Sequence, residues 1–258
     1  MIYDLQKGSL LKRASAILLD GILLVILVTG FSFALSAILH YGDYADTYSE
    51  GLDRYEKQYN IDFSTIIDEN SMTDAEKEAY LAVVEAMNED DEMIYAFNMM
   101  IRIIILEVSI AIVLAFAIVE FIIPLFLKNG QTVGKKIFGL GVMRTNGTRV
   151  RAVSLFIRTF MGKCVLETMI PALVVMIVIF SAWGIMESIG LFGPILVIGL
   201  LVAQMILLFM TKRHTMIHDL ISDCVVVDLG SQMIFEDEQA MNEYQAKEAA
   251  REAAVSPY

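Results

Sequence analysis

Four long apolar segments constrain this chain more than any other feature of its sequence. A hydrocarbon core of roughly 30 Å requires about 20 apolar residues in a helix. Segments of this kind occupy residues 14–39, 103–127, about 164–183 and about 194–210. Because 57% of the residues are hydrophobic, a disordered chain or an ordinary soluble domain is excluded. The sequence therefore predicts an all-α integral membrane protein with four transmembrane helices.

The distribution of charge predicts the topology of these spans. The net charge is −12, but the acids are concentrated in residues 40–98 and in the tail, whereas residues 128–163 carry lysines and arginines and no acid. Basic loops are retained in the cytoplasm. We therefore expect residues 128–163 and both termini inside and residues 40–98 outside. The acidic balance argues against a nucleic-acid partner and leaves the lipid bilayer as the expected partner.

The spans divide the chain into seven segments, each with its own composition. The segments are 1–39, the N-terminal segment and first span; 40–98, an acidic extracellular helical insert; 99–127, the second span; 128–163, a basic cytoplasmic loop with a β-hairpin; 164–210, a hairpin of the third and fourth spans; 211–228, a cytoplasmic His-Asp motif and strand; and 229–258, an acidic C-terminal tail.

The acidic insert is expected to form two amphipathic helices. Tyrosines including Tyr48, Tyr55 and Tyr59 recur at helical spacing and leave the acids on the other face. Residues 73–76, Thr-Asp-Ala-Glu, form the pattern of a capping box before a second apolar stripe. Two interpretations stay open: a solvated insert packed through its tyrosines, or a cap that collects cations or binds a partner.

The cytoplasmic loop is expected to contain a short β-hairpin. Residues 139–144 are predicted to form a strand, Asn146-Gly147 a turn, and Arg149 and Val150 the start of the return strand. Residues 224–227 are too short for a span and rich in β-branched side chains. They are expected to pair with this hairpin as a small cytoplasmic sheet.

Charged side chains within the spans are the candidate functional residues. Each costs about 2.5–3.5 kcal/mol at mid-membrane, so charges retained there are paired or functional. With the first span starting near residue 14, Asp20 lies about 9 Å inside the membrane. We expect Arg13 within ion-pair distance of Asp20 or Asp219. In the structural interpretation this pair joins helix ends; in the functional one a carboxylate binds a cation or carries a proton. The candidate binding or transport residues are Arg13, Asp20, Glu120, Glu167 and Asp219.

Motifs for hydrolytic catalysis are absent from the sequence. It contains no glycine-rich phosphate loop, nucleophile elbow or zinc-protease helix motif. His214 and His218 have a spacing that metal sites use, but without a third ligand we favour interfacial or capping histidines. We expect no enzymatic activity, no cofactor and no resident metal.

Three groups of residues resemble the RDD family of bacterial multipass membrane proteins. They are KRASA (12–16) followed by Asp20, TVGKK (132–136) followed by GLGV (139–142), and HDLI (218–221) before the run at 225–227. The family is named for one arginine and two aspartates, which match Arg13, Asp20 and Asp219. The resemblance covers residues 7–40 and 99–228. Asp223-Cys224 departs from the family's usual Gly-Thr.

The resemblance implies a location in the bacterial cell membrane and suspected transport, with sodium/proton antiport reported for a few members. Other members act as accessory or inhibitory partners of membrane proteins. Our first hypothesis is a small transporter of an ion or solute, coupled to cations or protons through the inner carboxylates. A chain with four spans would dimerise to enclose a pathway. The alternative is a non-transporting adaptor that regulates a partner membrane protein through residues 40–98.

Overall fold

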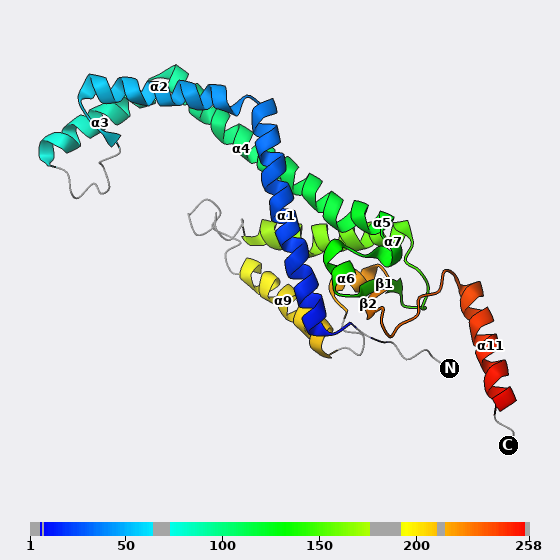
Figure 1. Ribbon diagram of the computed structural model, residues 1–258. Coiled ribbons are helices and arrows are strands. Elements are labelled where there is room, and N and C mark those ends of the chain that lie inside the picture. Colours follow the sequence, from blue (N-terminus) through cyan, green and yellow to red (C-terminus); the bar gives the residue numbers. More distant parts are fainter. Residues whose placement is uncertain (1–5, 7, 64–72, 176–191, 211–214, 256–258) are drawn as a thin grey trace. The chain divides into compact units, whose positions relative to one another are not determined.

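The computed structural model describes the chain except residues 1–5, 7, 64–72, 176–191, 211–214 and 256–258 (Figure 1). Most of the described residues are helical. The chain divides into two compact units. The first comprises Met1–Leu23 with Phe116–Tyr258, and the second comprises Leu24–Ala115. The candidate site residues all fall in the first unit.

Two helices within the described part of the chain are long and apolar enough to cross a membrane. They are α1 (Leu10–Ile38) and the helix Asp91–Phe126, which consists of α4 (Asp91–Ala117), the π-helix η3 (Ile118–Ile122) and α5 (Ile123–Phe126). None of the most apolar window of α1 is buried, and only 22% of that of the second helix is. A soluble core helix would be covered by protein, whereas apolar surface exposed over this length is typical of helices that face lipid. The two helices contain the first two predicted spans except the last residue of each, 39 and 127.

The third and fourth predicted spans are described in part. The helix that leads into the third consists of α7 (Ala152–Phe156) and the π-helix η5 (Ile157–Met169), and its backbone stays helical to residue 175. The remainder of the predicted span at 164–183 lies outside the described residues. The fourth predicted span falls within α9 (Phe192–Met210).

A small antiparallel sheet joins two segments that are far apart in the sequence. Strand β1 (Leu140–Arg144) pairs with β2 (Cys224–Asp228) so that Val142 lies opposite Val226. Short helices precede both strands, α6 (Val133–Ile137) before β1 and α10 (Ile217–Ile221) before β2 (Figure 1). Alternate residues of each strand enter two different apolar clusters, so both faces of the sheet are buried. The predicted pairing of residues 224–227 is confirmed.

The predicted β-hairpin is wrong in its return strand. The turn forms, since Gly147 N donates to Arg144 O over 3.0 Å and Arg144 N donates to Thr148 O over 2.9 Å. The return is limited to an isolated bridge between Met143 and Arg149. Arg149 N instead donates to Phe235 O over 2.7 Å, because the acidic tail segment occupies that side of the turn. The sheet therefore consists of β1 and β2.

The second unit contains the two amphipathic helices predicted for the insert. They are α2 (Tyr41–Tyr59) and α3 (Asp74–Asn88), and α4 begins next at Asp91. Tyr55, Val83 and Met93 form the buried core of this unit. Lys77 N donates to Thr73 O over 2.9 Å at the start of α3, while the side chains of residues 74–76 lie outside the described part.

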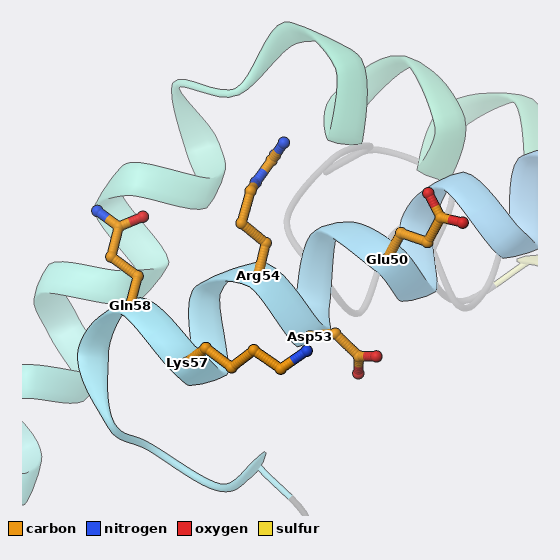
Figure 2. Close-up of a pocket in the computed structure, with 5 residues that line it drawn as sticks. All are labelled: Glu50, Asp53, Arg54, Lys57 and Gln58. Carbon is orange, nitrogen blue, oxygen red and sulfur yellow. The ribbon is translucent and has the colours of Figure 1, made fainter.

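One exposed face of α2 carries a pocket lined by charges of both signs. Figure 2 shows that Lys57 extends along the helix toward Asp53, whereas Arg54 points away from α2. Arg54 forms an ion pair with Asp90. The pocket is lined by Glu50, Asp53, Arg54, Lys57 and Gln58.

Asp90 connects α2 with the start of α4. Its Oδ1 atom accepts hydrogen bonds from the backbone N–H groups of Glu92 (3.1 Å) and Met93 (3.2 Å), and Oδ2 accepts one from the Tyr55 hydroxyl (3.0 Å). The Met93 N–H in particular lowers the pKa of Asp90, and Arg54 adds to this effect. Asp90 is therefore the N-cap of α4.

We expect Asp90→Ala to destabilise the second unit by about 1–2 kcal/mol, the usual loss for an N-cap. The measurement is thermal unfolding followed by near-ultraviolet circular dichroism, with Asp53→Ala as the control for an exposed aspartate. Because the folded pKa lies below the unfolded one, this stabilisation is complete above about pH 4 and disappears as the pH falls further. Equal melting of the two variants at pH 7 would contradict the capping role.

Candidate functional site

Asp20 holds the N-terminus of α6 against α1. Its Oδ2 atom accepts a hydrogen bond from Thr132 Oγ1 over 2.5 Å, and Oδ1 accepts one from Gly134 N over 2.8 Å. Thr132 is the N-cap of α6 and accepts a hydrogen bond from Lys135 N. A carboxylate at a helix N-terminus satisfies free N–H groups and interacts favourably with the helix dipole. Asp20 is thus buried with both oxygens bonded.

The approach of α6 to α1 requires a glycine. A Cβ atom on Gly134 would lie 2.2 Å from the carbonyl oxygen of Ala16 and 3.0 Å from Asp20 Cγ. Ala16, one turn before Asp20, is itself fully buried. The small residues therefore let the two backbones come close enough for the Asp20 carboxylate to reach both donors.

A buried ion pair connects η5 with α10. Arg158 Nε and Nη2 both donate to Asp219 Oδ1, over 2.8 and 2.7 Å, and the two side chains are only 4% and 2% exposed. Burial raises the pKa of Asp219, but the Arg158 guanidinium outweighs it and holds that pKa below its ordinary value. Likewise, burial lowers the pKa of Arg158, and Asp219 more than compensates. Both groups are charged at every physiological pH.

The position of Arg13 differs from our expectation. Asp219 pairs with Arg158, and Asp20 with Thr132 and Gly134, whereas Arg13 Nη2 donates to the backbone carbonyl of Val226 over 2.5 Å. This contact ties the start of α1 to β2. Among the described residues no ion pair joins Arg13 to Asp20 or to Asp219, although Asp219 is near enough to interact with Arg13 electrostatically.

His218 extends the network from Arg158 to Glu167. Its Nδ1 atom lies 2.7 Å from Glu167 Oε2, its backbone N donates to Glu167 Oε1 over 3.0 Å, and its Nε2 lies 3.1 Å from Arg158 Nη2. Burial lowers the pKa of His218 below its ordinary value, and Arg158 adds to this effect. A neutral ring satisfies both ring contacts, because Nδ1–H donates to Glu167 while Nε2 accepts from Arg158.

Glu120 lies where the second membrane helix changes from α to π geometry. Four residues later stands Pro124, which has no N–H to donate to the Glu120 carbonyl. Thr159 Oγ1 donates to that carbonyl instead, over 2.9 Å. The Glu120 carboxylate forms an ion pair with Lys163. Pro124 thus leaves the Glu120 carbonyl to accept from Thr159, at the residue whose side chain pairs with Lys163.

The π-helix η5 supplies most of the charged partners. Its backbone hydrogen bonds join residues five positions apart, so side chains with that spacing lie near one face of the helix. Arg158 and Lys163 are spaced in this way, and Thr168 Oγ1 donates to Lys163 O over 2.8 Å. Gly162 allows η5 to approach α10, since a Cβ there would lie 2.6 Å from His218 Cα.

Lys135 is a buried lysine beside this cluster. Its Nζ atom donates to Thr132 Oγ1 over 3.2 Å, and its side chain is almost inaccessible to solvent. Burial, together with the positive charges of Lys163 and Arg158, lowers the pKa of Lys135 to about 7. Lys135 is therefore poised between its charged and neutral forms at physiological pH.

Four of the five residues predicted from the sequence occupy three groups of the first unit. Asp20 belongs to the α1–α6 contact, Glu120 to the pair with Lys163, and Glu167 and Asp219 to the network on η5 and α10. Arg13 lies apart from these three groups, on the contact between α1 and β2. The sequence analysis did not identify the hydrogen-bonding partners of these residues. Segment 128–163 is basic and contains no acid, which indicates that any base buried there needs a carboxylate from another part of the chain. His214 lies outside the described residues. The missed partners are Thr132, Gly134, Lys135 and His218.

The long, exposed apolar helices are those of an integral membrane protein. The chain belongs to the RDD family, a family of multipass membrane proteins, whose model matches residues 7–223. The match ends at Asp223, the residue before β2. Comparisons with curated proteins and with solved structures gave no match.

Proposed function

We propose that this protein is a small transporter that exchanges a cation for protons through Glu120 and Glu167. The observation that supports this function is the nature of their partners. Glu120 is paired with Lys163, and Glu167 lies 2.7 Å from His218, and lysine and histidine side chains both have a charged and a neutral form. An arginine partner stays charged, so the pair Arg158–Asp219 serves to join η5 and α10.

Competition for one carboxylate would couple the two ions. The Lys163 ammonium neutralises Glu120 in the state described here. A cation that binds Glu120 must displace this ammonium, and a proton that binds Glu120 removes the charge that attracts the cation. Because the proton and the cation exclude one another at Glu120, uptake of one requires release of the other.

The proposal includes the topology that the charge distribution predicts. Four spans cross the bacterial cell membrane, both termini and residues 128–163 lie in the cytoplasm, and the insert lies outside. In this orientation Glu120 and Glu167 face the inner third of the bilayer. A homodimer would complete the pathway, because four helices enclose little space.

The test is cation-dependent proton flux in proteoliposomes. We expect Glu120→Gln to reduce this flux by at least about tenfold, since an amide does not exchange a proton near neutral pH. The double variant Glu120→Gln/Lys163→Met removes the stranded ammonium and should fold normally while staying inactive. Glu107→Gln, which alters a second carboxylate of the same membrane helix, serves as the control. Normal flux in a well-folded double variant would refute the role of Glu120.

An adaptor function is the second candidate, favoured by the independent core of the insert. Tyr55, Val83 and Met93 make residues 24–115 a unit of its own, with a charged pocket on its surface (Figure 2). A partner membrane protein could bind this unit without any ion movement. If the wild type moves no cation in proteoliposomes, this function replaces transport.

A further inference from the structure

A cavity lined by charges of both signs lies between the turn after β1 and the start of α11 (Glu238–Val255). It encloses about 390 Å³, within the usual range for a site that holds a small molecule. The segment 144–151 supplies its arginines, and the tail supplies its acids. These residues are Arg144, Arg149 and Arg151, and Glu236, Asp237 and Glu238.

Backbone hydrogen bonds hold the two segments together. Arg149 N donates to Phe235 O over 2.7 Å, and Phe235 N donates to Gly147 O over 3.1 Å. The Phe235 side chain is buried. Further along the cavity, Asn146 Nδ2 donates to Glu238 Oε1 over 2.9 Å. The cavity is therefore a fixed part of the fold of the first unit.

The charges that line this cavity do not neutralise one another. Among the described residues, neither Arg149 nor Arg151 forms an ion pair, and both side chains are exposed. The third arginine, Arg144, lies 3.6 Å from Asp223, which does not line the cavity. Glu236 is likewise exposed, and no described residue pairs with it. A ligand that carries one negative and one positive group could contact both sets of charges at once.

Exposed apolar surface continues from the arginines into a helix. Arg151 is the N-cap of α7, which leads into the third predicted span. Val153 and Phe156, three positions apart and so on one side of α7, are 69% and 44% exposed. Basic residues directly before an apolar, lipid-facing helix lie at the level of the lipid phosphates. A ligand with acyl chains could place them along this side of α7.

We propose that this cavity binds the headgroup of an aminophospholipid, with its phosphate on Arg149 and Arg151 and its primary ammonium on Glu236 and Glu238. The planar guanidinium donates paired hydrogen bonds to phosphate oxygens. The ammonium has three N–H donors, and ionised carboxylates are acceptors only. This binding goes beyond ion transport and is compatible with an adaptor as well.

The two sets of charges select among headgroups. Phosphatidylglycerol offers a phosphate to the arginines but no cation to the acids. Phosphatidylcholine offers both charges, but its quaternary ammonium has no N–H to donate. Phosphatidylethanolamine satisfies both sets, so it should bind best.

Native mass spectrometry of the full-length protein in detergent, titrated with these three lipids carrying identical acyl chains, tests the selectivity. We expect the wild type to bind phosphatidylethanolamine at least about threefold more tightly than either other lipid, the effect of one exposed charge pair. Equal affinity for the three lipids, or tighter binding of phosphatidylglycerol, would overturn the proposal without recourse to any variant.

Two double variants assign the roles of the charges. Arg149→Gln/Arg151→Gln should weaken phosphatidylethanolamine by about threefold or more. Glu236→Gln/Glu238→Gln keeps an oxygen for Asn146 but loses the negative charges, so its preference for phosphatidylethanolamine over phosphatidylglycerol should disappear. Arg251→Gln and Glu252→Gln, exposed residues of α11 outside the cavity, are the matched controls and should bind as the wild type does. An unchanged lipid preference in the acid variant refutes the proposed site.

Soluble phosphoethanolamine separates a lipid from a free zwitterion. Because it lacks the acyl chains that cover α7, it should displace phosphatidylethanolamine only in large excess. Displacement at equal concentrations would show that the ligand is a soluble zwitterion and would reject the lipid. Cation flux is a separate measurement: its absence rejects the transporter and leaves the lipid site standing, and flux without lipid selectivity rejects the lipid site alone.

Discussion

Replacing Arg158 with alanine is expected to lower the free energy of unfolding by about 3–5 kcal/mol, because it breaks a buried ion pair and leaves one charge without its partner. Asp219 would stay desolvated beside an empty space. His218 Nε2 would also lose its neighbour Arg158 Nη2, 3.1 Å away. The connection between η5 and α10 therefore fails at two points.

The measurement is thermal unfolding of the purified protein, in which this loss amounts to a decrease on the order of 10 °C. Arg251→Ala is the control, since that arginine is 79% exposed and its ion pair with Glu248 contributes little. The variant Arg158→Met/Asp219→Leu removes both charges and should recover much of the stability. A decrease in Arg158→Ala no larger than in Arg251→Ala would show that the pair is not structural.

The elements that depend on local pattern were predictable from the sequence. Hydropathy located α1 and the second membrane helix, helical periodicity of the tyrosines located α2, and β-branched residues located β2. Each of these signals resides within one segment of the chain and reflects which face of the element meets lipid, core or solvent.

The partners of the buried charges were not predictable in the same way. Arg13 and Asp20 share a helix face, which suggested a common cluster, yet the partner of Asp219 comes from a π-helix 61 positions earlier in the chain. A period of 3.6 residues does not place Arg158 and Lys163 on one face, whereas the π geometry does. Pro124, four residues after Glu120, is visible in the sequence. The π-helical backbone at Glu120, and the hydrogen bond that Thr159 donates to its carbonyl, could not be predicted from that proline alone.

The reach of Asp20 to α6 depends on Gly134, and substitution there has the second large effect we expect. The Cβ atom of Gly134→Ala would lie 2.2 Å from Ala16 O, a backbone atom that cannot move without α1. The helix α6 must retreat, which lengthens the hydrogen bonds of Asp20 to Gly134 N and Thr132 Oγ1. Overpacking and weakened buried hydrogen bonds together are expected to lower the free energy of unfolding by roughly 3 kcal/mol.

The neighbouring glycine of α1 gives the matched control, because a Cβ atom on Gly21 would meet nothing within 4 Å. Gly21→Ala should stabilise the helix by about 0.5–1 kcal/mol, since alanine loses less conformational freedom than glycine. The two Gly→Ala variants should therefore shift the melting temperature in opposite directions. If Gly134→Ala melts at or above the temperature of Gly21→Ala, the close contact between α1 and α6 does not exist in the folded protein, and Asp20 must find its hydrogen-bond donors elsewhere.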